Sequence, residues 1–137
     1  MKLVSDLMST DVVTTGKNDV LSVADDLMKT HRFRHMPVLD EDGRLAGLVS
    51  QRDLLLNALV RALGFGTVAG DKMKGKIAVK EVMTNDVLTT TPHTPLGEAA
   101  GLMADRKIGC LPVVDNGKLV GILTEGDFVA AAAQDSS

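Results

Sequence analysis

The chain contains an internal duplication, in which the segment Val4 to Asp53 aligns with the segment Val79 to Asp127 almost residue for residue. The offset is 75 positions, as from Val4 to Val79, until a one-residue deletion after Asp40 changes it to 74. A match of this length and order is typical of a repeated structural unit. Each copy of about fifty residues would be marginally stable alone, so we expect both copies to share one core.

Each copy contains a short strand followed by an amphipathic helix. The β-branched stretch Val12 to Thr14 predicts the strand in the first copy. The apolar residues that follow recur at the spacing of one helix face. They are Leu21, Ala24, Leu27 and Met28, matched in the second copy by Leu96, Ala99, Leu102 and Met103.

We call the residues between the start of each copy and its first strand the lead-in. Each lead-in contains two apolar residues four positions apart, Val4 with Met8 and Val79 with Met83. This spacing predicts one helical turn before each copy. We expect these turns to tie the two copies together. The methionines recur at matching positions, and we expect them mostly to fill the core.

A β-hairpin and a second helix complete each copy. In the first copy, His35 to Leu39 and Leu45 to Val49 predict the two arms, and Gly43 supplies the positive φ of the turn. The second copy has a shorter turn, and its hairpin consists of Leu111 to Val114, Asp115 to Gly117 and Leu119 to Leu123. The predicted order of elements in each copy is β-α-β-β-α.

The helices that close the copies suggest the domain organisation. Leu54 to Leu63 is apolar on nearly every side, which predicts a helix covered on more than one side. Phe128 to Ala133 predicts a thinner, alanine-rich helix with a frayed tail. We expect domains over residues 1–63 and 79–137, joined by a glycine- and lysine-rich linker over 64–78 that could order over a ligand. Two apolar closing helices, one per copy, predict a homodimer.

Composition argues against several classes of partner. Net charge is −3, without a basic stripe, and the only aromatic residues are three phenylalanines, so we expect no nucleic-acid partner. No apolar run reaches the roughly 18 residues of a membrane span, and the N-terminus lacks a signal sequence, so we expect a cytoplasmic protein without a membrane partner. Cys110 lies in an apolar strand and predicts a buried, unreactive thiol.

Three segments in each copy carry a resemblance to a known family. They are Asp11 to Thr14, Met36 to Asp40 and Gly47 to Asp53, with Asp86 to Thr89, Leu111 to Asp115 and Gly121 to Asp127. Over almost its whole length the chain resembles a tandem pair of cystathionine-β-synthase-type (CBS) domains, also called a Bateman module. The resemblance implies two pseudo-twofold-related β-α-β-β-α repeats packed through their sheets, two clefts that bind AMP, ADP or ATP, and disc-shaped dimers. It also implies a sensor rather than an enzyme.

Two motifs at helix starts suggest how such a ligand would be held. In Ser50-x-x-Asp53 and Thr124-x-x-Asp127, the hydroxyl and the free amides of the helix start favour a phosphate, and the carboxylate can accept hydrogen bonds from a ribose diol. The same pattern also predicts a capping box, which would stabilise the helix by about 1 kcal/mol without any ligand. Both interpretations remain open from the sequence, and capping and binding can alternate.

The two predicted sites differ in charge. The first copy has Arg34, His35 and Arg52 around its motif, whereas the second copy has Gly109, Cys110 and Gly126 at the matching places. An arginine binds phosphate through a bidentate fork that glycine cannot replace. We therefore predict tighter phosphate binding at the first site. The alternative is that both arginines are solvated surface residues.

The candidate ligand-binding residues include the paired threonines at the end of each first strand, where backbone groups could recognise adenine, and residues of the proline-bearing strands. The full set is Thr14, Thr15, Arg34, His35, Met36, Pro37, Ser50, Arg52 and Asp53 in the first copy, and Thr89, Thr90, Leu111, Pro112, Thr124 and Asp127 in the second.

The sequence contains no pattern typical of a metal site or an enzyme. His31 and His35 lie four apart, but the helix is expected to end near His31 and no third ligand is nearby. There is no P-loop, no GxGxxG and no nucleophile with a paired base, so we expect neither catalysis nor a catalytic cofactor.

The sequence therefore predicts a regulatory module that senses an adenine nucleotide, with AMP favoured and ADP or ATP as alternatives. Binding would change how the repeats or the dimerised chains pack, and so signal to an unidentified protein target. One alternative is a ligand-independent dimeric scaffold that uses the helix over Leu54 to Leu63 as its partner surface. Another is a sensor of a different adenosyl ligand, such as S-adenosylmethionine, held by the methionines.

Overall fold

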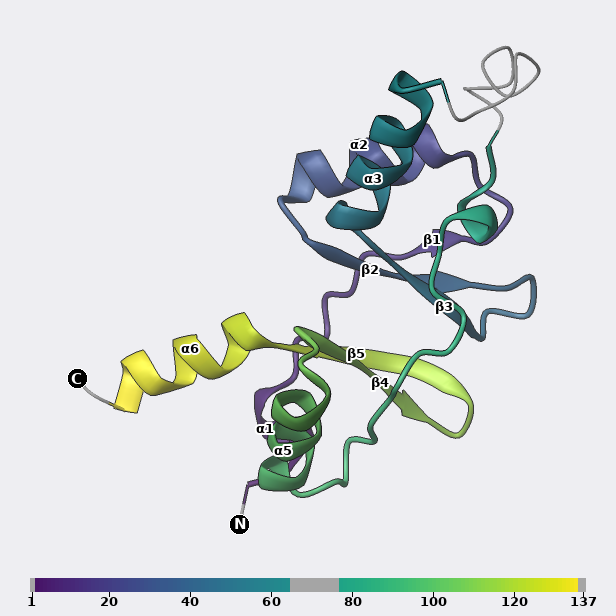
Figure 1. Ribbon diagram of the computed structural model, residues 1–137. Helices are drawn as coiled ribbons and strands as arrows, with labels where there is room; N and C mark the ends of the chain where they lie inside the picture. The colour runs from purple at the N-terminus through teal and green to yellow at the C-terminus, as the bar shows by residue number, and fades with distance from the viewer. Residues whose placement is uncertain (1, 65–76, 136–137) are drawn as a thin grey trace. The chain divides into compact units, whose positions relative to one another are not determined.

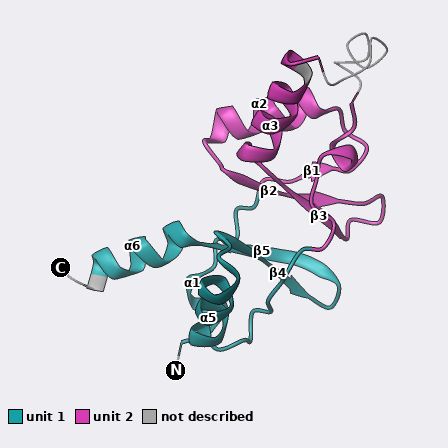
Figure 2. Cartoon of the chain, in the orientation of Figure 1, with its two compact units in different colours: residues 1–12, 87–137 teal, residues 13–86 magenta. Residues whose placement is uncertain are grey.

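The computed structural model of the chain describes residues 2–64 and 77–135 (Figure 1). The chain divides into two compact units, shown in separate colours in Figure 2. Unit 1 comprises Met1–Val12 and Val87–Ser137, and unit 2 comprises Val13–Asp86. Each unit therefore contains the body of one copy of the duplication and the lead-in of the other.

Unit 2 is built on a three-stranded sheet in the order β1-β2-β3. Its elements are β1 (Thr15–Gly16), α2 (Leu21–His31), β2 (His35–Leu39), β3 (Leu45–Ser50), α3 (Gln51–Ala62) and the 3₁₀ turn η2 (Val79–Glu81). Strand β1 is parallel to β2, and β2 is antiparallel to β3 with His35 opposite Ser50. The hairpin arms and the end of α2 at His31 confirm the predictions from the sequence.

Unit 1 is built on a two-stranded antiparallel sheet, β4-β5. Its elements are α1 (Val4–Leu7), α5 (Leu96–Arg106), β4 (Cys110–Asp115), β5 (Lys118–Thr124) and α6 (Glu125–Asp135). Thr90 forms a single parallel bridge with Val113. This bridge occupies the place that β1 has in unit 2, since Thr15 pairs there with Val38.

The prediction of a first strand over Val12 to Thr14 is wrong, because the strand lies at Thr15–Gly16. Two hydrogen bonds explain this position. The Thr15 hydroxyl and the Gly16 amide both donate to Asp19 Oδ2, at 3.0 and 2.7 Å. This local turn fixes the end of the strand, so the residues just before the turn are the ones that reach β2.

The turns have the backbone conformations that their residues favour. Gly43 has φ 79° in the hairpin of unit 2. In unit 1, Asn116 and Gly117 have φ 52° and 80° in succession, as a tight two-residue hairpin requires. Both predictions for these turns are confirmed.

The expected single core is instead two buried clusters, one in each unit. The cluster of unit 2 comprises Ala24, Met28, Met36, Val38, Val49, Leu54 and Val79. The cluster of unit 1 comprises Val4, Ala99, Met103, Leu111, Val113 and Leu123. Each hairpin buries one face against the helices of its own copy, but each cluster also takes one fully buried valine from the lead-in of the other copy.

The lead-ins are exchanged with the same hydrogen-bond pattern on both sides. The Val4 amide donates to the Thr94 carbonyl and the Val79 amide to the Asp19 carbonyl, both at 2.9 Å. Further on, Ser9 bridges to Ile122 in β5, and Thr84 bridges to Leu48 in β3. The lead-ins thus tie the two copies together, as the sequence predicts.

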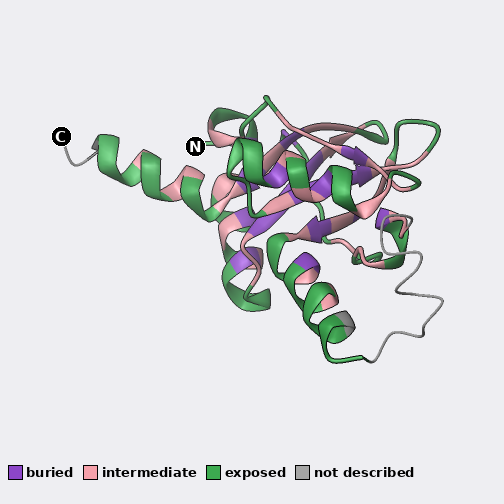
Figure 3. Ribbon diagram, turned by 90° about the horizontal axis from the view of Figure 1, so that it is seen from above, coloured by how far each residue is buried: buried purple, intermediate pink, exposed green. Residues whose placement is uncertain are grey.

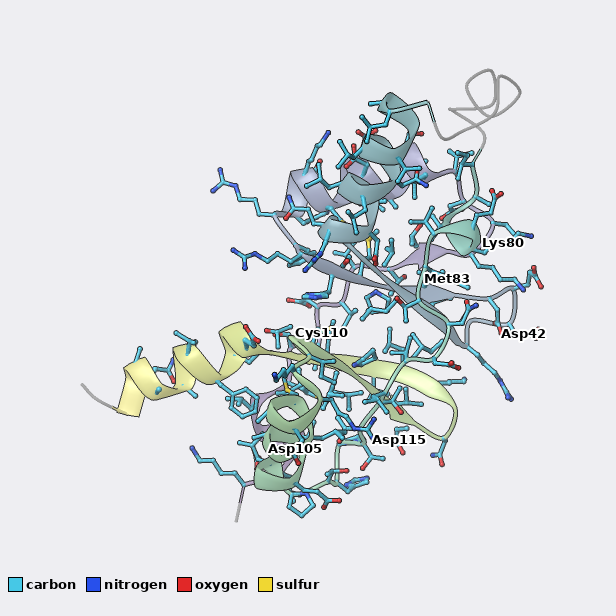
Figure 4. The ribbon with its side chains drawn as sticks, in the orientation of Figure 1. Asp42, Lys80, Met83, Asp105, Cys110 and Asp115 are labelled. Carbon is cyan, nitrogen blue, oxygen red and sulfur yellow. The ribbon has the colours of Figure 1, made fainter. Side chains whose placement is uncertain are left out.

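Two glycines allow this exchange. A Cβ atom on Gly47 would lie 2.6 Å from Met83 Sδ and 2.7 Å from the Thr84 carbonyl oxygen. Gly121 is similarly close to the other lead-in, at 2.8 Å from Met8 Sδ. Met83 is labelled in Figure 4 beside β3. The glycine in each returning strand is therefore required by the close approach of a second backbone.

The described residues cover the helix α3 on one side only, which corrects the expectation of cover on several sides. Leu54 is 8% exposed and packs in the cluster of unit 2. Its other large apolar side chains are exposed, with Leu55 at 68% and Leu59 at 52%, and Leu63 just beyond the helix is 64% exposed. In Figure 3 the helix that runs into the grey segment is mostly green, with smaller purple and pink patches. The predicted linker over 64–78 lies mostly outside the described residues, and none of the described helices is long and apolar enough to cross a membrane.

Candidate ligand-binding sites

The start of α3 places Ser50 and Asp53 in a reciprocal capping box. The Asp53 amide donates to Ser50 Oγ at 3.1 Å, and the Ser50 amide donates to Asp53 Oδ2 at 2.9 Å. The Gln51 amide donates to the Arg34 carbonyl at 2.8 Å. The Arg52 amide has no acceptor within residues 2–64 and 77–135. The helix start thus keeps a backbone donor that an anion could use, in the positive field of the helix dipole.

The start of α6 has the same framework. The Asp127 amide donates to Thr124 Oγ1 at 3.3 Å, and the Thr124 amide donates to Asp127 Oδ2 at 2.9 Å. The Glu125 amide donates to the Gly109 carbonyl at 3.1 Å, as Gln51 does to Arg34. The capping interpretation of both motifs is therefore confirmed, and ligand binding would have to use what the caps leave free.

The two carboxylates differ in what they leave free. Asp127 Oδ2 also accepts the Thr124 hydroxyl at 3.2 Å, and Asp127 Oδ1 accepts the Ser9 hydroxyl at 2.9 Å. No donor in the described part of the chain reaches Asp53 Oδ1. Sequence reasoning missed Ser9. The available signal was its alignment with Thr84, which places a hydroxyl at the same point of both lead-ins.

The basic residues of the first copy gather at the end of the β2-β3 hairpin where α3 begins. His35 lies opposite Ser50 in the sheet, and the Arg34 carbonyl receives the first helical amide. Arg34 and Arg52 are exposed, and neither forms an ion pair with a described residue. Their guanidinium groups are therefore available to an anion at the helix start.

The matching end of unit 1 has the opposite charge. Cys110 lies opposite Thr124, and Gly109 and Gly126 stand where unit 2 has Arg34 and Arg52. In addition, Glu125 stands where unit 2 has Gln51. The electrostatic contrast between the two helix starts is thus larger than the arginines alone indicate.

The threonine edges lie further along each proline-bearing strand. Thr15 pairs with Val38, three residues beyond His35, which is about 10 Å at the rise of a strand. Thr15 is 3% exposed and Thr90 is 7% exposed, so their side chains are largely buried. Thr14 is half-buried and Thr89 is exposed, which leaves them as the accessible members of each pair.

Four candidate residues on the strands present no free side-chain surface. Met36, Pro37, Leu111 and Pro112 are each less than 2% exposed. Met36 and Leu111 belong to the buried clusters of their own units. Any part that these residues play in binding would therefore be to hold the strand in place.

Two further predictions concern Cys110 and the histidines. Cys110 is 4% exposed, which confirms its predicted burial, and this burial raises the pKa of its thiol to about 12. It lies at the start of β4 (Figure 4). The His31 ring stacks on Phe33 with centroids 5.6 Å apart. Among the described residues, no three His, Cys, Asp or Glu side chains are grouped as metal ligands would be.

Comparison with known proteins identifies the family. The protein-family model described as CBS domain matches the chain twice, at residues 4–59 and 79–134. The CBS domain-containing protein YhcV of Bacillus subtilis (strain 168) is 33% identical over 137 residues, which are all of this chain and 90% of that protein.

Two solved structures have the same fold. The structure of CBSX2 in complex with AMP has a TM-score of 0.83 and 32% identity, and the match covers 100% of both chains. The CBS domain pair of protein MJ0100, in complex with 5'-methylthioadenosine and S-adenosyl-L-methionine, has a TM-score of 0.79 and 27% identity over 98% of each chain. The chain therefore belongs to the CBS domain family and has the α/β fold of a CBS domain pair.

Proposed function

We propose that the chain is a regulatory module that binds an adenine nucleotide at the start of α3, with AMP favoured over ADP and ATP. The first site, as we name it, comprises Arg34, His35, Ser50, Arg52 and Asp53. The observation that carries the proposal concerns the described residues: none of them donates to Asp53 Oδ1, accepts the Arg52 amide or forms an ion pair with the two guanidinium groups. A ribose diol and a phosphate need these two kinds of partner.

The arrangement of the other candidates supports a nucleotide rather than a free anion. Thr14 precedes Thr15, which pairs with β2 about 10 Å from the helix start. This separation suits a ligand with its phosphate at Arg52 and its base at the threonine edge. CBSX2 binds AMP and MJ0100 binds two adenosyl ligands, which supports the adenosyl class.

Binding would act by changing the packing of the repeats or of two dimerised chains. The ligand must bind one packing state more tightly than the other, since otherwise it shifts no equilibrium. We propose that a downstream protein reads this state.

Calorimetric titration of ligand-free protein with AMP, ADP, ATP and S-adenosylmethionine tests the proposal. Asp53→Ala and Asp127→Ala are matched variants, because each removes the acidic member of one capping box. We expect tight AMP binding that is lost in Asp53→Ala, where only weak binding at the start of α6 remains, and kept in Asp127→Ala. Loss of binding only in Asp127→Ala would show that the nucleotide binds in the other unit. Heat from S-adenosylmethionine alone would show that this ligand, and not AMP, is the one that binds.

A dimeric scaffold is the second candidate, and the exposed face of α3 favours it. Leu55, Leu56, Leu59, Val60 and Leu63 are all at least 46% exposed. A homodimer would cover such a patch. Light scattering of Leu55→Glu and Leu59→Glu, separately, against wild type tests for the dimer. A folded, dimeric protein that binds no adenosyl ligand would favour the scaffold.

A further inference from the structure

The carboxylate of Asp127 is nearly saturated with internal hydrogen bonds. It accepts the Thr124 amide and the Thr124 hydroxyl on Oδ2, at 2.9 and 3.2 Å, and the Ser9 hydroxyl on Oδ1 at 2.9 Å. An ionised carboxylate offers about four acceptor positions. A diol that donates two hydrogen bonds therefore cannot bind Asp127 unless one of the internal bonds breaks.

The carboxylate of Asp53, in contrast, accepts few internal hydrogen bonds. Within the described ranges it accepts one hydrogen bond, from the Ser50 amide. The residue aligned with Ser9 is Thr84, which is exposed and makes no side-chain hydrogen bond to Asp53. About three acceptor positions remain open at Asp53, which is enough for a diol.

Ser9 is the donor that a ligand would displace at Asp127. The backbone of Ser9 is held by two hydrogen bonds with Ile122, both 2.9 Å long. Met8 packs against Gly121, where an added Cβ would lie 2.8 Å from Met8 Sδ. The Ser9 hydroxyl can nevertheless rotate about χ1 without any movement of this backbone, and the residue is exposed. The Thr124 bonds, in contrast, belong to the cap of α6.

We propose that Ser9 is a specificity-determining residue that competes with the ligand for Asp127 and keeps the second site closed to a ribose diol at low ligand concentration. The second site, as we name it, comprises Thr124 and Asp127 at the start of α6. The residue comes from the lead-in of the first copy, whereas the site belongs to the second copy. This inference rests on the proposed function, because it assigns the order in which two equivalent motifs fill.

Ser9→Ala tests the inference, with Thr84→Ala as its matched control in the other lead-in. AMP binding to both variants is measured by calorimetry in an Asp53→Ala background, so that heat reports the second site alone. We expect Ser9→Ala to tighten AMP binding at that site about tenfold, because it removes a competing hydrogen bond to a charged group. Thr84→Ala should leave it unchanged.

Thermal melts of the same proteins separate this role from a structural one. Ser9→Ala should have a slightly lower melting temperature than its parent while binding AMP more tightly. If Ser9 were purely structural, its replacement would lower both the melting temperature and the AMP affinity. Unchanged or weaker second-site binding in Ser9→Ala, with first-site binding intact when Asp53 is present, would overturn this inference alone. Failure of AMP to bind any variant, Asp53 present or absent, would overturn the proposed function and this inference together.

Discussion

The two units share a framework and differ in the side chains placed on it. In both, a hairpin runs into a capped helix, a glycine admits the lead-in of the other copy, and the first helical amide bonds to the residue before the proline-bearing strand. In unit 2 this framework carries Arg34 and Arg52, and in unit 1 it carries Gly109 and Gly126.

This comparison separates what stabilises the fold from what binds. Capping, lead-in exchange and the buried clusters recur in both units, so they are the requirements of the fold. The charges and the occupancy of the carboxylates do not recur, and the fold does not need them. The residues that differ between the units are therefore the ones that we assign to function.

The two proline-bearing strands start with different residues, His35 in unit 2 and Cys110 in unit 1. We expect the largest effect of all in the chemical reactivity of Cys110. Burial raises the pKa of the thiol from 9.0 to about 12, so at pH 8 the thiolate is about a thousandfold scarcer than in an ordinary thiol. We expect native protein to react with a disulfide reagent at least that much more slowly than protein in urea. Rapid labelling of native protein would contradict the assigned burial.

The same shift predicts a pH dependence of stability. The folded state holds its thiol proton up to about pH 12, whereas the unfolded thiol loses its proton near pH 9. The contribution of Cys110 to stability is therefore complete below pH 9 and is lost as the pH rises towards 12. Cys110→Ala should remove this part of the alkaline decline, as measured by urea unfolding at pH 8 and pH 10.

The second prediction concerns the charge contrast. Replacing Arg34 and Arg52 together with alanine should weaken AMP binding at the first site by at least about a hundredfold, because each charge-assisted hydrogen bond contributes roughly 1.5–3 kcal/mol. The loss should be smaller at high salt, where wild-type binding is also weaker. Unchanged affinity at low salt would show that the arginines are only solvated.

Gly126→Arg is the reciprocal variant. A Cβ at Gly126 would lie 3.6 Å from Thr124 Oγ1, an ordinary contact, so the larger residue fits at this exposed position. We expect it to bring the second site closer to the first in AMP affinity, most clearly in combination with Ser9→Ala. Binding that stays absent in the combination would mean that Glu125 or another feature of unit 1 opposes the ligand.

The third prediction tests the shared framework. Gly47→Ala would place a Cβ 2.7 Å from the backbone oxygen of Thr84, which cannot move without breaking the bridge to β3, so we expect a loss of about 2 kcal/mol in the free energy of unfolding. Gly121→Ala should cost less, because its nearest backbone atom, the Ser9 oxygen, is 3.0 Å away. Gly101→Ala in α5 meets no atom within 4 Å and should instead stabilise by up to about 1 kcal/mol. Urea unfolding of the three variants gives the order directly.

Much of this framework follows from local sequence. Hydrophobic spacing predicts α2 and α5, and positive-φ residues predict both hairpins, because these features depend on neighbours in the chain. The capping boxes are also local. The first strand was misplaced because Asp19, four residues beyond Thr15, decides where the extended segment ends.

The rest depends on contacts between distant segments. The hydrogen bond from Ser9 to Asp127 joins residues 118 positions apart, and no local sequence pattern around either residue predicts it. Hydrophobic periodicity likewise does not show that Val4 and Val79 each pack in the buried cluster of the other copy, because it depends on neighbours in the chain. Of the site itself, the sequence could predict the motif and the charges, but not which carboxylate was already occupied.

The smallest expected effect comes from the caps, which should cost nearly the same in the two units. Ser50→Ala removes one hydrogen bond of 3.1 Å, and Thr124→Ala removes two longer ones of 3.2 and 3.3 Å. Each change should lower the free energy of unfolding by about 1 kcal/mol, measured by urea unfolding without ligand. Ser50→Thr, which keeps the hydroxyl, is the control and should lose little. If Ser50→Ala left the free energy of unfolding unchanged while AMP binding fell, the Ser50 hydroxyl would bind the ligand rather than cap the helix. Ser50 would then belong with the residues assigned to function and not with the shared framework.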